Sequence, residues 1–198
     1  MIDNASSLGW LLLILGFLFF SNYCTNELGK NFYGYKWEET KIYDILHENT
    51  PDFHEWKEVN DIIPIALIVS TFFIRNPGPL LKEFIGKYLL IMAFRAITMM
   101  STILPKHEKC DPNLTWINML KGQCYDKVFS GHMSFVLLGT LIYLREGILS
   151  LPTFFALNIA QFTSIILTRS HYTVDVLLAL FITYLVYDGD YHIFKKYF

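Results

Sequence analysis

Apolar and polar residues alternate in long blocks along this chain. A stretch such as 147–168 contains no Asp, Glu, Lys or Arg, as the core of a lipid bilayer requires of a helix. An apolar segment in lipid must satisfy its own backbone hydrogen bonds, and the alternation typical of barrel strands is absent. The pattern therefore predicts an all-α, polytopic membrane protein, with one domain over residues 1–198. Its six predicted transmembrane helices cover about 6–24, 59–74, 80–104, 129–149, 151–168 and 172–187.

Two long polar loops, 25–58 and 105–128, separate these segments. If successive helices cross in opposite directions, both loops and the turn 169–173 emerge on the same membrane face. The chemically interesting residues are then expected on that face. The basic residues do not decide which compartment it meets, because the face with more of them carries them in long loops rather than close to the helix ends.

Composition narrows the classes of function. Hydrophobic residues make up 53% of the chain, and the formal net charge is −2 without a basic cluster, which argues against nucleic-acid binding. The three cysteines, Cys24, Cys110 and Cys124, lack paired metal-site spacing, and neither a metal nor another cofactor is predicted. Cys110 and Cys124 share one loop, so a disulfide and two free thiols are both open.

The first candidate site is the start of the fourth apolar segment. Ser130 is a suitable N-cap, and Gly131 lets a ligand approach the backbone closely. A phosphate on the free amides of this helix start would have His132 beside it as a proton donor. Taken alone, the three residues fit equally an interfacial histidine at a capped helix.

The second candidate site is the pair His171 and Asp175. Their i, i+4 spacing places imidazole and carboxylate on one face of the sixth predicted helix. The carboxylate can fix the tautomer of the ring, so that the other ring nitrogen attacks phosphorus. A structural hydrogen bond or half of a metal site would explain the spacing as well.

The two candidate sites support each other. The fifth segment starts at the far end of the fourth and crosses the membrane back, which brings His132 and His171 to the same membrane face. Displacement at phosphorus also needs cationic groups for the equatorial oxygens. Three candidates for that role are Arg95, Lys127 and Arg169, although a structural ion pair explains Arg95 equally well. A choline head group is expected to meet aromatic rings near Asp126, unless these rings only mark the membrane interface. The candidate rings are Trp37, Trp56, Trp116, Tyr125 and Tyr172.

Three ordered stretches over about 80–187 resemble the sphingomyelin synthase family, the membrane branch of the type 2 phosphatidic acid phosphatase superfamily. They are a Thr-rich segment that begins at Arg95 and ends in Leu104-Pro105, a Cys124-x-Asp126-x-x-x-Ser130-Gly131-His132 motif, and a His171-Tyr172-Thr173-x-Asp175-Val176 motif. The resemblance implies a helical bundle of six spans and two-step transfer of a phospho-head group. In that scheme His171 takes the group from a donor phospholipid, Asp175 supports it, and His132 protonates the departing diacylglycerol and then activates the acceptor hydroxyl.

The implied partners are membrane lipids: a donor phospholipid and ceramide or diacylglycerol as acceptor, in the Golgi, endoplasmic reticulum or plasma membrane. Phosphatases of the superfamily typically carry Arg-Pro and Pro-Ser-Gly-His, whereas this chain has Phe129 before Ser130 and no Arg-Pro. Transfer is therefore favoured over hydrolysis by a lipid phosphatase or phospholipase C-like enzyme. A non-catalytic transporter or scaffold is the second alternative.

Overall fold

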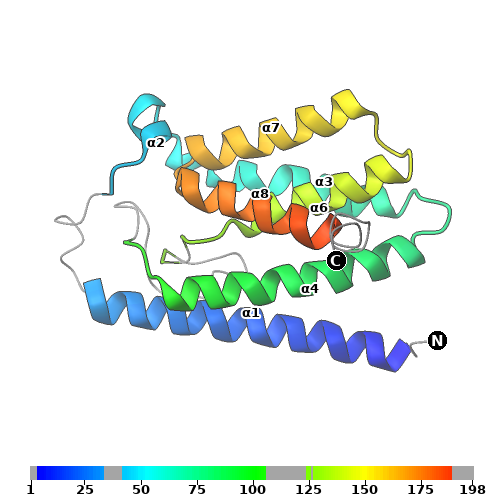
Figure 1. Cartoon of the computed structure of the whole chain (residues 1–198), viewed down its shortest axis with the longest axis horizontal. Coiled ribbons are helices and arrows are strands. Elements are labelled where there is room, and N and C mark those ends of the chain that lie inside the picture. Colours follow the sequence, from blue (N-terminus) through cyan, green and yellow to red (C-terminus); the bar gives the residue numbers. More distant parts are fainter. Residues whose placement is uncertain (1–3, 34–41, 106–123, 126, 189–198) are drawn as a thin grey trace, which may run out of the picture. The chain divides into compact units, whose positions relative to one another are not determined.

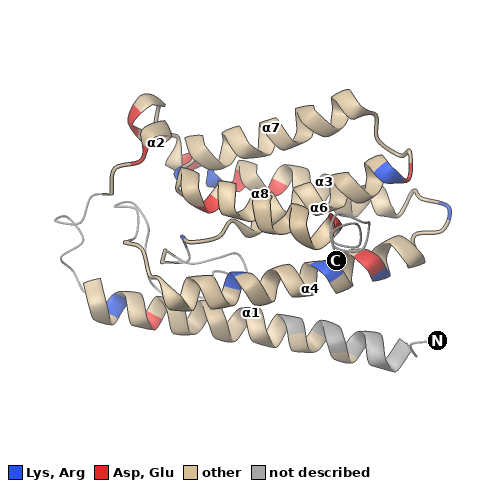
Figure 2. Ribbon diagram, viewed as in Figure 1, with Lys and Arg blue, Asp and Glu red and all other residues tan. Residues whose placement is uncertain are grey.

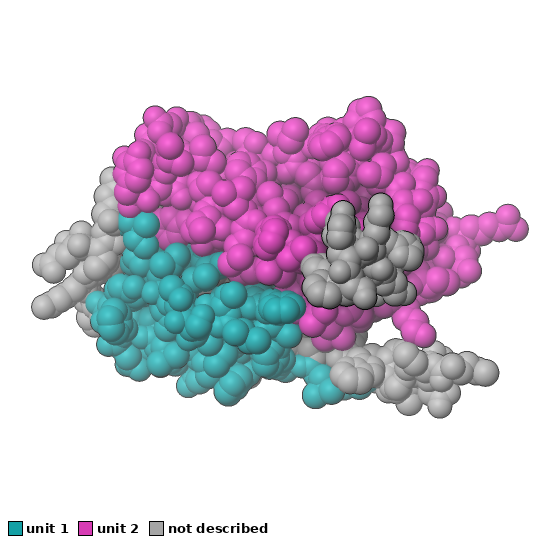
Figure 3. All heavy atoms as spheres, in the orientation of Figure 1, with its two compact units in different colours: residues 1–42, 92–128 teal, residues 43–91, 129–198 magenta. Residues whose placement is uncertain are grey.

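Every regular element in the described residues is a helix, which confirms the predicted all-α class for that part of the chain (Figure 1). The computed structural model describes residues 4–33, 42–105, 124–125 and 127–188. They form two compact units: unit 1 comprises residues 1–42 and 92–128, and unit 2 comprises 43–91 and 129–198 (Figure 3). The predicted single domain stays a prediction.

Six helices fall on the six predicted apolar segments. They are α1 (Asn4–Tyr33), α3 (Ile62–Thr71), α4 (Gly78–Ser101), α6 (Gly131–Arg145), α7 (Leu151–Leu167) and α8 (Thr173–Asp188). Among the described residues, α4 is the one helix both long and apolar enough to cross a membrane, and α7 is a shorter apolar helix. Six membrane crossings therefore stay a prediction.

Unit 1 contains α1, the last part of α4 and the residues before the fourth apolar segment. Arg95, inside α4, donates to the side-chain oxygen of Asn22 on α1 at 3.2 Å, so its buried guanidinium has a polar partner within the unit. Tyr125 stacks on Tyr33 and lies directly against Gly29. A Cβ at position 29 would lie 2.3 Å from the Tyr125 ring, so this close approach requires glycine.

Unit 2 contains the Ser130-Gly131-His132 end of the first histidine motif and all of the second, residues 171–176. Its central helix, α6, packs against α3, α7 and α8. The side chain of Ser130 caps α6 by accepting from the amide of Met133, and Ser150 caps α7 in the same way. Between these helices the chain turns at Gly147, whose φ of 70° suits glycine.

The surface of unit 2 carries many large apolar side chains, while its core contains polar as well as apolar residues. Polar side chains such as Ser134, Gln161 and Thr183 are fully buried. Large apolar side chains such as Phe73 and Phe181 are exposed instead. Exposed apolar surface on several helices indicates contact with lipid or with another apolar partner.

Two further elements, α2 (Ile45–Asn49) and the 3-10 helix η2 (His54–Asp61), lie mostly in the predicted 25–58 loop. Asp44 caps α2 by accepting from the amides of Leu46 and His47. The segment from Asp44 to Asp61, here called the clasp, contacts the turn between α7 and α8 repeatedly. Residues 44–58 were expected in a polar loop on the face of the candidate residues, and 59–61 in the second predicted helix; they instead form two short helices that contact the turn carrying His171.

Candidate active site

His132 lies in the first turn of α6 and is paired with a carboxylate from the clasp. Its Nε2 lies 2.8 Å from Oδ1 of Asp61, the last residue of η2. Both side chains are about one-third exposed, at 28% and 32%. The pair is therefore accessible to a ligand at the molecular surface.

His171 lies in the turn before α8 rather than on the helix itself, which begins at Thr173. Its Nδ1 is 3.6 Å from Oδ2 of Asp175, a distance of electrostatic attraction rather than of a hydrogen bond. The same oxygen accepts the amide hydrogen of Tyr172 at 2.9 Å. Asp175 thus closes the turn that carries His171, and both side chains are almost fully buried, at 7% and 0% exposure.

A backbone hydrogen bond joins the beginnings of the two helices that follow these histidines. The amide of Ser130 donates to the carbonyl oxygen of Asp175 at 3.4 Å, so α6 and α8 start side by side. His132 and His171 consequently lie at the same end of unit 2. The clasp strengthens this arrangement, because Asn60, next to Asp61, donates to the hydroxyls of Thr168 and Ser170 at 2.9 and 2.8 Å.

Arg169 is buried in the turn between α7 and α8. Its φ of 53° lies in the left-handed region, which is unusual for a residue other than glycine. Its guanidinium donates to the carbonyl oxygens of His47 and Thr50 and to the Thr50 hydroxyl. These bonds tie the turn to the clasp. A phosphate-binding role for Arg169 stays a prediction, whereas its contacts with the clasp are observed.

Asp44 fixes the other side of the same turn. Besides capping α2, its carboxylate accepts from the amide and the hydroxyl of Thr173, both at 2.7 Å. Burial acts to raise the pKa of Asp44, but the bonds from Thr173 and His47, with the nearby His47 ring, outweigh burial and lower it. The carboxylate is therefore held in its charged form at neutral pH.

Two histidines of the clasp complete these contacts. The Nε2 of His47 donates to the carbonyl oxygen of His171 at 3.1 Å, and the Nδ1 of His54 donates to that of Thr168 at 3.2 Å. The sequence interpretation missed the clasp residues. One signal was present: Asp61 lies at the start of the second predicted helix, 59–74, on the face where both histidines were expected.

Four other predicted site residues are not part of unit 2. Arg95, Tyr125 and Lys127 belong to unit 1, where all three are buried. Burial is the main cause that raises the pKa of Tyr125, with a smaller contribution from Tyr33. Asp126 lies outside the described residues, so its predicted contact with a head group stays a prediction.

The predicted aromatic pocket is described only in part. The Tyr172 ring lies 5.5 Å from the His47 ring, so it sits beside the candidate site. Trp56 is exposed on η2. Trp37 and Trp116 lie outside the described residues, and recognition of choline by these rings stays a prediction.

Besides the two histidine pairs, the described residues include cysteines and other possible metal ligands. Cys124 is disulfide-bonded and Cys24 is a free thiol, whereas Cys110 lies outside the described residues. Within the part of the chain that the structure describes, no group of three or more His, Cys, Asp or Glu side chains is arranged to hold a metal ion.

Comparison with known proteins now adds to this geometry. Residues 123–193 match the PAP2 superfamily C-terminal domain. The match includes both histidine motifs and supports the type 2 phosphatidic acid phosphatase superfamily, whose members are typically phosphatases or phosphotransferases and often membrane-associated. It thus supports an enzyme that acts on phosphate esters. No curated protein matches the chain. The resemblance to the sphingomyelin synthase branch stays a prediction.

Proposed function

We propose that this protein is an integral, multi-pass membrane transferase of the endomembranes or plasma membrane. It moves a phosphate-linked head group, with phosphocholine as the first expectation, from a donor phospholipid to ceramide or diacylglycerol. The observation that carries this proposal is the presence of two imidazole–carboxylate pairs at one end of unit 2. His132 with Asp61 and His171 with Asp175 supply a proton donor and a nucleophile.

In the first step, Nε2 of His171 attacks the phosphorus of the donor lipid. The bond between phosphorus and the diacylglycerol oxygen breaks, and that oxygen takes a proton from His132. Asp175 faces Nδ1 of His171 and stabilises the positive charge that develops on the ring. Asp61 lies at Nε2 of His132, so Nδ1 is the nitrogen that exchanges the proton with the lipid.

In the second step, His132 takes the proton of the acceptor hydroxyl. The acceptor oxygen attacks phosphorus, the bond to Nε2 of His171 breaks, and both histidines return to their first state. His132 thus acts as an acid in the first step and as a base in the second, so its ring must be able to contact the reacting oxygen of each lipid. The partial exposure of the His132 and Asp61 side chains supports that role.

The membrane setting is supported by the exposed apolar faces of unit 2 and by the length of α4. Transfer over hydrolysis is supported by the sequence, because Phe129 stands where phosphatases of the superfamily typically carry proline.

The decisive experiment incubates purified protein with a fluorescent ceramide or diacylglycerol and, in turn, phosphatidylcholine, phosphatidylethanolamine or phosphatidylinositol. Transfer yields a fluorescent product that carries the head group of one donor. Release of a water-soluble phospho-head group without acceptor would instead identify a hydrolase. No product of either kind, from protein that is folded and inserted, would refute an enzyme of this class and favour a transporter or scaffold.

A further inference from the structure

The helices of unit 2 are short for membrane-spanning segments. α6, α7 and α8 contain 15, 17 and 16 residues. At about 1.5 Å per residue their lengths are roughly 22 to 26 Å. A typical hydrocarbon core is about 30 Å thick and needs about 20 residues of helix. Tilting shortens the reach of a helix further, so these helices cannot be matched to a typical core by changing their angle.

Two of these helices carry ionisable residues at both ends, which mark how far their apolar part extends. α6 carries His132 in its first turn and ends at Arg145, and α8 carries Asp175 in its first turn and ends at Asp188. In each helix the two residues are about 20 Å apart along the axis. In Figure 2 the bodies of α7 and α8 between their ends carry no charged residue.

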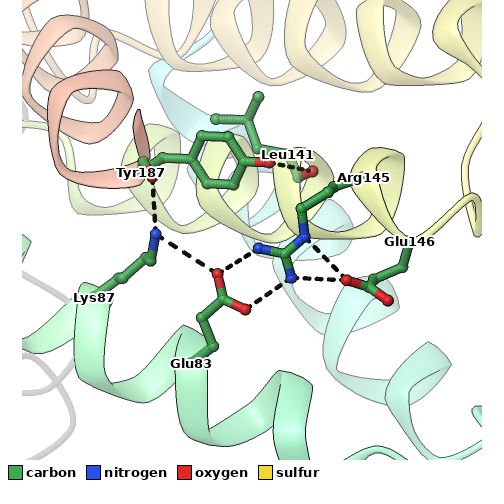
Figure 4. A network of polar contacts seen from close by, with 6 residues as sticks. All are labelled: Glu83, Lys87, Leu141, Arg145, Glu146 and Tyr187. Carbon is green, nitrogen blue, oxygen red and sulfur yellow. Dashed lines mark hydrogen bonds and ion pairs between the residues drawn. The ribbon is translucent and has the colours of Figure 1, made fainter. Parts of the chain in front are cut away.

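The end of α6 opposite the candidate site is held by a polar network (Figure 4). Arg145 donates from both terminal nitrogens to the two carboxylate oxygens of Glu83, each at 2.7 Å. Lys87 lies 3.6 Å from Glu83 and donates to the carbonyl oxygen of Tyr187 on α8 at 2.8 Å. The network joins α4, α6 and α8. Its hydrogen bonds hold the Arg145 side chain in place, so it cannot extend toward a more distant membrane surface.

Between these two polar ends the outward side chains are apolar on three helices. Ile65 and Ile68 on α3, Phe155 and Ile159 on α7, and Leu177 and Phe181 on α8 are all largely exposed. Exposed apolar side chains on several helices, together with charged groups at the ends of α6 and α8, are the pattern that contact with a hydrocarbon core produces. The thickness of hydrocarbon that this surface can span is set by the lengths of the helices that carry it.

We propose that unit 2 is matched to a thin bilayer, with a hydrocarbon core of about 20 to 25 Å. In a thicker core, either the catalytic end or the Arg145 end is drawn below the level of the lipid phosphates. A donor phosphate then meets His171 less often, and transfer slows. The effect on transfer rests on the proposed function, whereas the match between apolar surface and bilayer does not.

The test places the full chain in vesicles of phosphatidylcholine with dimyristoleoyl, dipalmitoleoyl, dioleoyl or dierucoyl chains. Thermal unfolding is measured without acceptor, and transfer is measured with a fixed trace of fluorescent ceramide. We expect the unfolding midpoint to be highest with the two shorter chains. Transfer should fall on the order of tenfold from dimyristoleoyl to dierucoyl vesicles.

A double variant, Glu83→Leu with Arg145→Leu, separates bilayer thickness from recognition of the donor chains. It removes the ion pair between Arg145 and Glu83, leaves Lys87 bonded to the Tyr187 carbonyl, and extends the apolar surface of α6, so its optimum should move to longer chains while the donor lipids stay the same. A midpoint that peaks in dioleoyl or thicker bilayers, or that ignores chain length, would overturn the proposal. The expected order of midpoints without transfer in any vesicle would support the thin-bilayer match and refute the proposed function.

Discussion

The two imidazole–carboxylate pairs of unit 2 are built in opposite ways. His171 and Asp175 are four residues apart, are buried, and face one another at 3.6 Å across a turn that the carboxylate itself closes. His132 and Asp61 come from elements 71 residues apart, are partly exposed, and are in hydrogen-bond contact at 2.8 Å. One pair is local and protected, and the other is assembled by the fold and reachable.

This difference suits the two roles in phosphoryl transfer. A nucleophile that carries the phospho-head group benefits from burial, because water is kept from hydrolysing the intermediate. A group that gives and takes protons must reach the lipid oxygen in both steps. The difference is consistent with the proposed roles, the nucleophile in the buried pair and the acid–base group in the exposed pair.

The largest expected effect is loss of the buried pair. His171→Ala should abolish transfer and any phosphorylated protein intermediate, because no other group is proposed to form the bond to phosphorus. Asp175→Asn should lower kcat on the order of 100-fold, since the ring loses its charge support. Radiolabelled donor phosphate and membrane fractionation measure the adduct and the insertion. An adduct that persists in His171→Ala would reverse the assignment of the two pairs.

Loss of the exposed pair should cost less. We expect Asp61→Asn to lower kcat about 10- to 100-fold, because His132 keeps a hydrogen-bond partner but loses the compensating charge. Glu58→Gln, an exposed change on the same 3-10 helix, is the matched control and should leave kcat unchanged. Equal losses in both variants would mean that the clasp responds to its total charge rather than to the contact with His132.

Arg169 tests whether the turn or the phosphate needs the guanidinium. Because φ at this position is 53°, Arg169→Gly removes the side chain without adding backbone strain. If the residue positions His171 through the clasp, kcat should fall about tenfold with KM nearly unchanged. A rise in KM for the donor that accounts for the whole loss would show that Arg169 holds the phosphate instead.

The smallest expected effect concerns Asp44. Its pKa is lowered in the folded protein, so the carboxylate stabilises the fold above its ordinary pKa and this stabilisation is lost as the pH falls through the lowered value, below about 4. Asp44→Asn should therefore reduce the free energy of unfolding by about 1 kcal/mol at neutral pH. The difference between the two proteins should shrink on acidification, as measured by unfolding midpoints at pH values from neutral down to about 3. A constant difference would contradict the charged role.

The sequence predicted the local features of this molecule and missed those that depend on distant contacts. Apolar runs bounded by polar turns indicated six helices, and the spacing of His171 and Asp175 indicated their proximity, because both signals lie within a few turns of chain. The first helix continues to Tyr33, past the predicted end at Cys24, since its polar residues Thr25 and Asn26 are buried inside unit 1.

The contribution of the clasp was not predictable from spacing. Asp44 and Asp61 look like ordinary helix-capping residues, and their partners Thr173 and His132 lie far away in the sequence. Short elements such as α2 and η2 also carry weak periodic signals, because their conformation depends on tertiary hydrogen bonds.

The clasp has a consequence for the biogenesis of the protein. Asp44 meets Thr173 across 129 residues of chain, and His47 meets His171 across 124. In the proposed membrane setting, the earlier segments leave the ribosome and insert into the bilayer well before the turn with His171 is synthesised. The proposed catalytic centre is therefore expected to assemble last, when α8 packs against α6. A nascent or truncated chain that ends before this helix is expected to insert into the membrane without transferase activity. Partly synthesised chains are therefore not expected to modify membrane lipids.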